Sequence, residues 1–415
     1  MNIPSLNNHY ALLALFLSPW KNEETIHRLS NFVQKENVNW GRLLYMANLH
    51  FCAPLWFASL QKDGLLPLLP LDLQTYLMHL HQANTERQDA FRRAAIEIIS
   101  ILDDIDVPVI LLKGVATFCD DLYQDPGARM MGDLDFLIKA QHIEQVGSIL
   151  LQYGYNEQAD CFGKSSGFFN SNAPHHLPRF FKPGTPVVVE MHFQTAQGQA
   201  GRVLPTDLSW TNKKSIAWEG LNPFVLIPIY RLLHNTVHAL VPRAAYTTSI
   251  ISLSQLAEFA YLVHRYRSVI EWHEWWERGA NQGLSRQFRV YLTLANSLMG
   301  MPFPERLGRL GFPGLHVARI SAACNTRANN LCGCEMALET VTKRIKDVAV
   351  RIYINVFGIL NRPAWDWQNL CYKQGLRNFP LRLYCLFFFF FRRNFKAIYR
   401  RLKKMRFLIK KPKHL

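Results

Sequence analysis

Two aspartates stand one residue apart inside a segment that otherwise resembles a buried strand, RMMGDLDFLI at residues 129–138. Successive side chains of a strand point to opposite faces, so Asp133 and Asp135 share one face. Neighbouring carboxylates repel each other unless they are protonated, hydrogen-bonded or neutralised by a cation. The segment therefore predicts a strand with one charged face and a partner for that charge.

A third carboxylate lies in another strand-like segment, PVVVEMHF at residues 186–193. Glu190 is central in this segment and shares a face with Val188 and His192. If the two strands are neighbours, three carboxylates converge on one patch of sheet, and oxygen ligands of this kind suit Mg²⁺. Two such ions about 3.5–4 Å apart can hold a triphosphate during in-line phosphoryl transfer.

Two basic features near these carboxylates suit a triphosphate. Lys113 and Gly114 end the strand-like run VPVILLKG, where backbone N–H groups at the start of a helix can face phosphate oxygens. Arg129 stands four residues before Asp133 and offers a planar fork of donors. On the face of Glu190, His192 is either a group that orients a ligand or a structural histidine.

Each signal also has a simpler explanation. A lone Asp-x-Asp pair is most often a solvated turn, but the apolar residues around this one argue for a strand. Glu190 could be an edge residue that pairs with Lys182 or Arg179, and Lys113 could extend from a strand end into solvent. Four histidines could suggest a zinc site: His175, His176, His234 and His238. The last two are one helical turn apart, which suits metal ligation, but without a thiolate or a third ligand at a predictable spacing we expect helix packing.

The pattern along the chain predicts an α+β fold. Helical periodicity fills the N-terminal segment and returns from about residue 223, whereas a strand, helix, strand, helix and hairpin order lies between. Residues 176–181, the turn KPGT and residues 186–193 form the predicted hairpin. The expected regions are a helical N-terminal region at 1–95, a catalytic α/β domain at 96–200, a helical region at 215–350 and a basic aromatic tail at 373–415.

The net charge of +16 is concentrated in the tail. Lys373 to Lys413 supply 14 of the 47 basic residues, and no acidic residue follows Asp366, so the rest of the chain is nearly neutral. A positive electrostatic field over the whole protein, as expected of a protein dedicated to binding duplex nucleic acid, is therefore excluded. The aromatic and basic stretch at 383–413 could lie on an anionic membrane surface, contact nucleic acid, or pack on the globule as a helix.

The remaining features predict a cytoplasmic protein. The first twenty residues lack a basic start and a small-residue cleavage pattern, so we expect an ordinary helix there rather than a secretory signal. No apolar run approaches the length of a transmembrane helix. The eight cysteines are scattered, and we interpret Cys324, Cys332 and Cys334 as structural thiols because they lack a zinc-binding spacing. Peripheral binding at the inner membrane surface would depend on the tail.

Taken in order, these motifs resemble an uncharacterised bacterial nucleotidyltransferase family within the DNA polymerase β-like superfamily. The resemblance covers about residues 30–270 and rests on a short series of motifs: LLKG at 111–114, Tyr123, Pro126, Arg129, GDLDFLI at 132–138 and VEMHF at 189–193. It implies that Asp133, Asp135 and Glu190 are catalytic and bind two Mg²⁺ ions, and that Gly114 is the turn glycine. Val115 follows this glycine where many superfamily members have Ser or Gly, so Lys113 is the candidate phosphate ligand.

The resemblance implies an enzyme that moves a nucleoside monophosphate from an NTP such as ATP to an acceptor hydroxyl or phosphate. Lys113, Gly114 and Arg129 would steady the triphosphate, and the flanking helical regions would form the acceptor pocket. Neither the acceptor nor the base preference follows from the sequence. The alternatives are a catalytically idle binding module that retains the fold, and an RNA-modifying nucleotidyltransferase that uses the basic tail.

Overall fold

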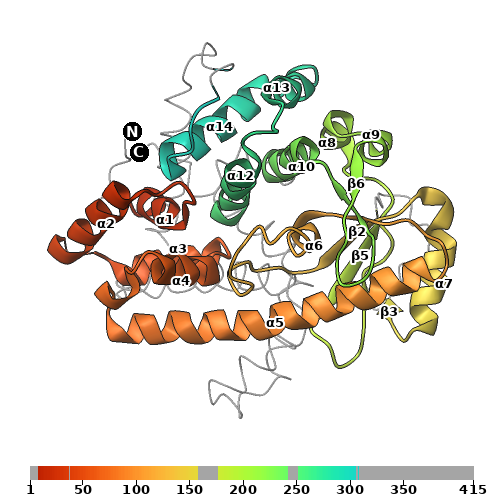
Figure 1. The fold of residues 1–415 in the computed structure, drawn as a ribbon, viewed down its shortest axis with the longest axis horizontal. Helices are drawn as coiled ribbons and strands as arrows, with labels where there is room; N and C mark the ends of the chain where they lie inside the picture. The colour runs from red at the N-terminus through yellow and green to blue at the C-terminus, as the bar shows by residue number, and fades with distance from the viewer. Residues whose placement is uncertain (1–7, 37, 158–175, 242–250, 305–306, 308–415) are drawn as a thin grey trace, which may run out of the picture. The chain divides into compact units, whose positions relative to one another are not determined.

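The computed structural model describes residues 8–36, 38–157, 176–241, 251–304 and 307. In these residues helices precede and follow a mixed seven-stranded sheet with the strand order β3-β4-β5-β2-β1-β7-β6, which confirms the predicted α+β fold (Figure 1). The tail at 373–415, His175 and the three cysteines at 324, 332 and 334 lie outside the described residues. Our expectations for them stay predictions.

Five α-helices precede the sheet. They are α1 (His9–Leu17), α2 (Glu23–Lys35), α3 (Trp40–Leu49), α4 (Ala53–Lys62) and α5 (Leu71–Asp103), with a 3₁₀ turn η1 (Leu66–Leu68) before α5. The expected N-terminal helix is confirmed as α1, which is apolar all round and almost entirely buried. Asn22 caps α2 by accepting a hydrogen bond from the Thr25 N–H at 2.9 Å. Figure 1 shows the long α5 running past α4 to the sheet, across the expected boundary at residues 95 and 96.

The hairpin that carries Glu190 belongs to a sheet of seven short β-strands. The strands are β1 (Ile110–Leu111), β2 (Leu134–Leu137), β3 (Asn156–Glu157), β4 (Phe180–Phe181), β5 (Val188–His192), β6 (Lys213–Ser215) and β7 (Phe224–Leu226). Antiparallel pairing of β4 with β5 confirms the predicted hairpin. Strand β5 also runs parallel to β2, so the two carboxylate-bearing strands are neighbours.

The two faces of β2 differ in character. Leu134 and Phe136 are fully buried in a core with residues of α5 and of α7 (Ile143–Gln152), which follows the 3₁₀ turn η2 (Ala140–His142). Asp135 and Leu137 alternate with them and therefore point to the opposite face. Leu137 joins the second core, which is built from the helices before and after the sheet.

The helical region after the sheet begins later than the periodicity predicts. Two short helices, α8 (Gly198–Val203) and α9 (Thr206–Thr211), lie between β5 and β6, and the helices after β7 are α10 (Pro228–Leu240), α12 (Leu253–Tyr266), α13 (Trp272–Ala280) and α14 (Ser285–Met299). Our expectation of a helix from about residue 223 was wrong for the first few residues, because Phe224–Leu226 form β7 beside β1. Pro228 explains the switch, since it disfavours a helical residue before it and fits the first turn of α10.

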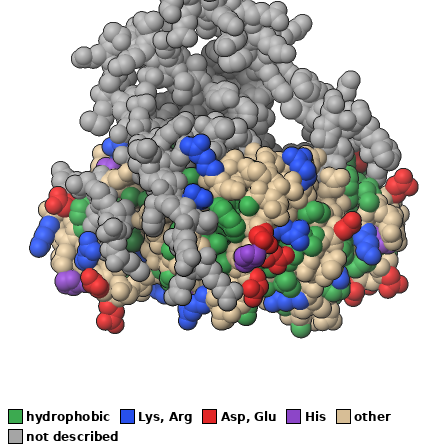
Figure 2. All heavy atoms as spheres, turned by 90° about the horizontal axis from the view of Figure 1, so that it is seen from above, with side chains coloured by type: hydrophobic (Ala, Val, Ile, Leu, Met, Phe, Trp, Pro, Cys, Tyr) green, Lys and Arg blue, Asp and Glu red, His purple; other side chains and the backbone are tan. Residues whose placement is uncertain are grey.

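The surface of the described part carries both signs of charge. On the face drawn in Figure 2, Lys and Arg side chains are interspersed with Asp, Glu and hydrophobic side chains. This mixture agrees with the near balance of charges before the tail. Among the described helices, none combines the length and the apolar character needed to cross a membrane.

Candidate active site

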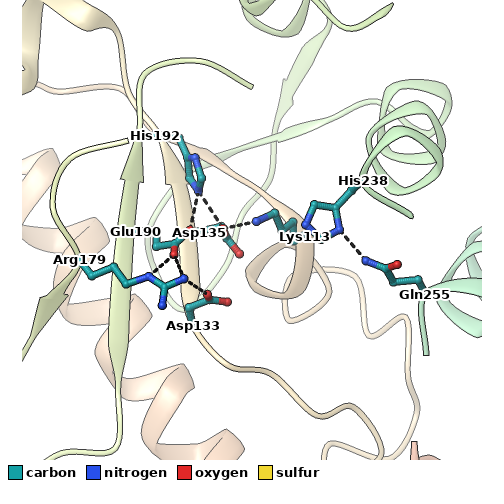
Figure 3. A network of polar contacts seen from close by, with 8 residues as sticks. All are labelled: Lys113, Asp133, Asp135, Arg179, Glu190, His192, His238 and Gln255. Carbon is teal, nitrogen blue, oxygen red and sulfur yellow. Dashed lines mark hydrogen bonds and ion pairs between the residues drawn. The ribbon is translucent and has the colours of Figure 1, made fainter. Parts of the chain in front are cut away.

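The strand register places Asp135 directly beside Glu190. Asp135 on β2 pairs with Glu190 on β5, and His192 follows two residues later on the same face. One ligand atom from each of these three side chains lies within 4.8 Å of the other two (Figure 3). All three side chains are almost fully buried, with at most 5% of any of these residues exposed.

Asp133 lies at the open rim of this cluster, immediately before β2. Its side chain is 31% exposed, and Arg179 connects it to the buried carboxylates. Arg179 donates from Nε to Glu190 Oε1 at 2.5 Å, and its Nη2 lies 3.8 Å from Asp133 Oδ2. The structure therefore places Asp135 and Glu190 side by side and connects Asp133, on the accessible side, to Glu190 through Arg179.

Lys113 enters the cluster from the opposite side. It is the first residue of the short helix α6 (Lys113–Ala116), which follows β1. Its Nζ lies 2.6 Å from Asp135 Oδ1, while the backbone N–H of Leu112 donates to the Asp135 carbonyl at 3.0 Å. The backbone of Lys113 is in the left-handed region, at φ +46°, which is uncommon for a residue with a long side chain. The turn thus holds an ammonium group against the buried aspartate.

The pKa values of the carboxylates separate according to their partners. Burial alone would raise the pKa of Asp135, but the charge of Lys113 and the hydrogen bond from His192 outweigh it and hold this pKa well below its usual range. Against the same effect of burial, the hydrogen bond from His192 and the charge of Arg179 lower the pKa of Glu190 to about 2. Partial burial and the two neighbouring carboxylates raise the pKa of Asp133 to about 6. Asp133 is therefore the carboxyl group that protonates first.

His192 is fixed between the two buried carboxylates. Its Nε2 lies 2.8 Å from Asp135 Oδ1 and 3.4 Å from Glu190 Oε2. Burial works against a charged imidazole, but these two hydrogen bonds raise the pKa of His192. This geometry fits the predicted orienting role, and it also makes His192 a potential metal ligand, which the sequence analysis did not consider.

Gly114 is needed here for packing. A Cβ atom at this position would lie 2.1 Å from Met131 Sδ and 2.4 Å from Arg129 Nη1. Arg129 is itself held by Glu258 of α12, since its Nε and Nη2 lie 2.9 and 2.8 Å from Glu258 Oε2. The missing side chain of Gly114 thus leaves room for a guanidinium that ties the sheet region to the later helices.

A cavity of about 80 Å³ adjoins Lys113 on the side of α10 and α12. Charged side chains line it together with uncharged and apolar ones, and the polar members are Lys113, Arg129, Arg231, His234, Asn235, His238, Gln255 and Glu258. Burial holds the pKa of His234 well below its usual value, so this imidazole is uncharged at neutral pH. The rings of His234 and His238 meet edge to face with centroids 6.4 Å apart, and His234 is buried whereas His238 is exposed, so helix packing accounts for His234 alone.

Arg179 and Glu258 are the functional candidates that sequence reasoning did not assign. The alternative pairing of Glu190 with Arg179 named the correct contact, although it treated Glu190 as an exposed edge residue. Lys182, the other suggested partner, instead pairs with Glu97. The register of the β4–β5 hairpin could have indicated that Arg179 faces Glu190. No sequence pattern indicates the contact of Glu258 with Arg129, because the two residues are 129 positions apart.

The side chains of the cluster fit a divalent cation. Carboxylate oxygens of Asp133, Asp135 and Glu190 are the hard ligands that Mg²⁺ prefers, and a neutral imidazole is an acceptable additional donor for related ions. In the described part of the chain, Asp135, Glu190 and His192 are the one group of three such side chains whose ligand atoms lie close enough to share an ion, and Asp133 is linked to this group through Arg179. The fold and the site together define the class of protein: α+β proteins that carry an acidic cluster on two neighbouring parallel strands.

Comparison with known proteins gives the family. The model of a family described as uncharacterised nucleotidyltransferase matches residues 36–300, well over half of the chain, and the protein belongs to this family. Among solved structures, the crystal structure of an antigenic nucleotidyltransferase-like protein from Paracoccidioides brasiliensis is similar at 14% identity. The match has a TM-score of 0.32 and covers 54% of this chain and 98% of the other. No curated protein matches the sequence.

Proposed function

We propose that the protein is a Mg²⁺-dependent nucleotidyltransferase of the DNA polymerase β-like type, which moves a nucleoside monophosphate from an NTP to an acceptor. The observation that carries this proposal is the register of β2 and β5, which aligns Asp135 with Glu190 inside the segment matched by the family. A buried acidic cluster is unfavourable in a core, so its presence there is best explained by a ligand.

Asp133, Asp135 and Glu190 would hold the metal. When bound, Mg²⁺ would neutralise the triphosphate and favour ionisation of the attacking acceptor hydroxyl. In the transfer, the acceptor oxygen forms a bond to the α-phosphorus, the bond from that phosphorus to the bridging oxygen breaks, and pyrophosphate leaves with the bonding pair. The hydroxyl proton passes to water or to a base.

The structure argues for a metal-binding role of Glu190 over a role as the general base. With its pKa at about 2, Glu190 is a weak proton acceptor while Arg179 and His192 hold it. His192 would keep both buried carboxylates aligned because its Nε2 contacts each of them. The polar cavity beside Lys113 is the candidate place for part of the nucleotide or of the acceptor.

One observation favours a second candidate, an idle binding module. Lys113 and Arg179 already satisfy the carboxylates, as ion pairs would in a site that has lost its ligand. Thermal melting with Mg²⁺ and each NTP separates the two proposals, since a ligand at about 100 times its Kd adds about 2.7 kcal/mol of stability. No shift with any nucleotide would favour the idle module.

The activity itself is tested by incubating the protein with labelled NTPs and a cell extract. We expect label from one α-phosphate to appear on an acceptor, with release of pyrophosphate. A parallel reaction with Asp135→Asn protein identifies labelling that depends on the acidic cluster. Equal labelling by both proteins would contradict the proposed function.

A further inference from the structure

We propose that Lys113 and Arg179 make metal binding conditional on the nucleotide, so that the site takes up a divalent cation together with a triphosphate and binds the cation weakly alone. This inference rests on the proposed function and adds an order of binding to it. It assigns Arg179 and Lys113 as positioning residues that occupy the carboxylates until the triphosphate draws them away.

The contacts of the two side chains carry the first step of the argument. Lys113 Nζ lies 2.6 Å from Asp135 Oδ1, and Arg179 Nε lies 2.5 Å from Glu190 Oε1. Arg179 Nη2 also approaches Asp133 Oδ2 at 3.8 Å. Each of the three carboxylates therefore has a cationic side chain within 4 Å, which competes with a metal ion for its oxygens (Figure 3).

The charges of the cluster give the second step. Three carboxylates face two permanent cations, Lys113 and Arg179, and His192 contacts two of the same carboxylates. Two divalent ions added to this group would create a large excess of positive charge at short range, which is costly in a partly buried site. An NTP brings about four negative charges and offsets that excess, so metal and nucleotide favour each other's binding.

The exposure of the side chains gives the third step, because it shows which partners can leave. The Lys113 and Arg179 side chains are 24% and 38% exposed, whereas His192 is only 2% exposed. Both cations have long side chains, and Lys113 also lines the neighbouring cavity. The two cations can therefore turn from the carboxylates to phosphate oxygens while His192 stays in place.

The test is the affinity of the intact protein for Mn²⁺, measured by electron paramagnetic resonance with and without a non-hydrolysable NTP analogue. For the wild type we expect the analogue to tighten Mn²⁺ binding at least about tenfold. In Lys113→Met, Mn²⁺ binding without the analogue should become about tenfold tighter, and affinity for the analogue should fall. The exposed Lys62→Met is the matched control and should behave as the wild type.

Arg179→Gln provides a second variant if Lys113→Met does not fold. It should also tighten Mn²⁺ binding without the analogue, because it releases Glu190 and Asp133. The inference is overturned if the wild type binds Mn²⁺ equally well with and without the analogue, or if neither variant changes the affinity for Mn²⁺ alone. Failure of the proposed function looks different: neither Mn²⁺ nor the analogue then binds to any variant, in either order of addition.

Discussion

The two faces of strands β2 and β5 differ sharply in character. On one face Leu134, Phe136 and Met191 are fully buried under α5 and α7. On the other face, one residue along, Asp135, Glu190 and His192 form a buried polar cluster. The same nine strand residues thus supply both an ordinary core and a charged site.

This difference teaches how a small sheet supports an unfavourable cluster. The apolar face gains free energy by burial, while the polar face depends on ion pairs from Lys113 and Arg179 to offset the loss of hydration. Alternation along the strand keeps the two roles on separate residues. A substitution on the apolar face should therefore act mainly on stability, whereas a substitution in the polar cluster should act mainly on function, with smaller effects on stability that depend on pH.

The largest expected effect is on the polar face. Asp135→Asn should reduce kcat/KM for nucleotidyl transfer by at least about 10⁴-fold, because a central metal ligand loses its charge. The protein should remain folded, as judged by circular dichroism, although it loses an ion pair with Lys113. Asp103→Asn, at the exposed end of α5, is the control. Activity of Asp135→Asn near that of the control would remove the carboxylate from the mechanism.

The apolar face should show the opposite behaviour. Phe136→Ala removes a fully buried ring and should lower the free energy of unfolding by about 3–5 kcal/mol in denaturant titrations. Leu151→Ala on α7 is 45% exposed and should cost much less. Equal losses from the two variants would mean that this face does not supply the core.

A smaller difference in stability is expected between alanine substitutions at two glycines beside the cluster. Gly114→Ala should destabilise the protein by about 1–2 kcal/mol, since the new Cβ would displace Met131 and Arg129. Gly132→Ala has no atom within 4 Å of the new Cβ and should be nearly neutral. The pair is compared by thermal melting, and a reversed order would contradict the packing of Arg129 over Gly114.

The smallest effect concerns the pH dependence of stability. Because the pKa of Asp133 is raised from 3.8 to about 6 on folding, its protonated form stabilises the protein at low pH, and this contribution is lost as the pH rises through about 6. Asp133→Asn should therefore be more stable than the wild type by about 1 kcal/mol at pH 7.5, with little difference at pH 4. Denaturant titrations at the two pH values check this, and a variant less stable than the wild type at pH 7.5 would reverse the sign.

Glu190 supplies the contrasting case on the same face. Its pKa is lowered to about 2, so its ionised form stabilises the protein above about pH 4.5 and this contribution is lost as the pH falls. Glu190→Gln should therefore be less stable than the wild type at pH 7.5. If Asp133→Asn and Glu190→Gln both stabilise the protein at pH 7.5, the contact with Arg179 does not favour the ionised form of Glu190 over that of Asp133.

The sequence predicted those parts of the site that depend on local alternation. The strands around Asp135 and Glu190, their shared face and the β4–β5 hairpin follow from a two-residue period and a turn motif. Strand β7 was not predicted from the sequence because its three apolar residues, Phe224–Leu226, resemble the start of the apolar helix that follows at Pro228. Periodicity alone does not separate short apolar strands from helices.

Contacts between distant segments could not be predicted in the same way. The pairing of Arg129 with Glu258 depends on how α12 packs beside the sheet, which no local pattern encodes. Lys113 was expected at a phosphate, and in the structure it binds Asp135, since a charge that faces a buried carboxylate forms an ion pair. The carboxylate positions could be read from the sequence. Of their counterions, Arg179 was named as one of two possible partners of Glu190, whereas Lys113 was not named as the partner of Asp135.

The most direct test of the metal-binding carboxylates is anomalous scattering from a crystal grown with Mn²⁺ and a non-hydrolysable NTP analogue. We predict at least one Mn²⁺ peak within about 2.0–2.6 Å of oxygens from Asp135 and from Asp133 or Glu190, with the triphosphate bound to the same ion. A bound nucleotide whose ion lies away from these three carboxylates would contradict the account.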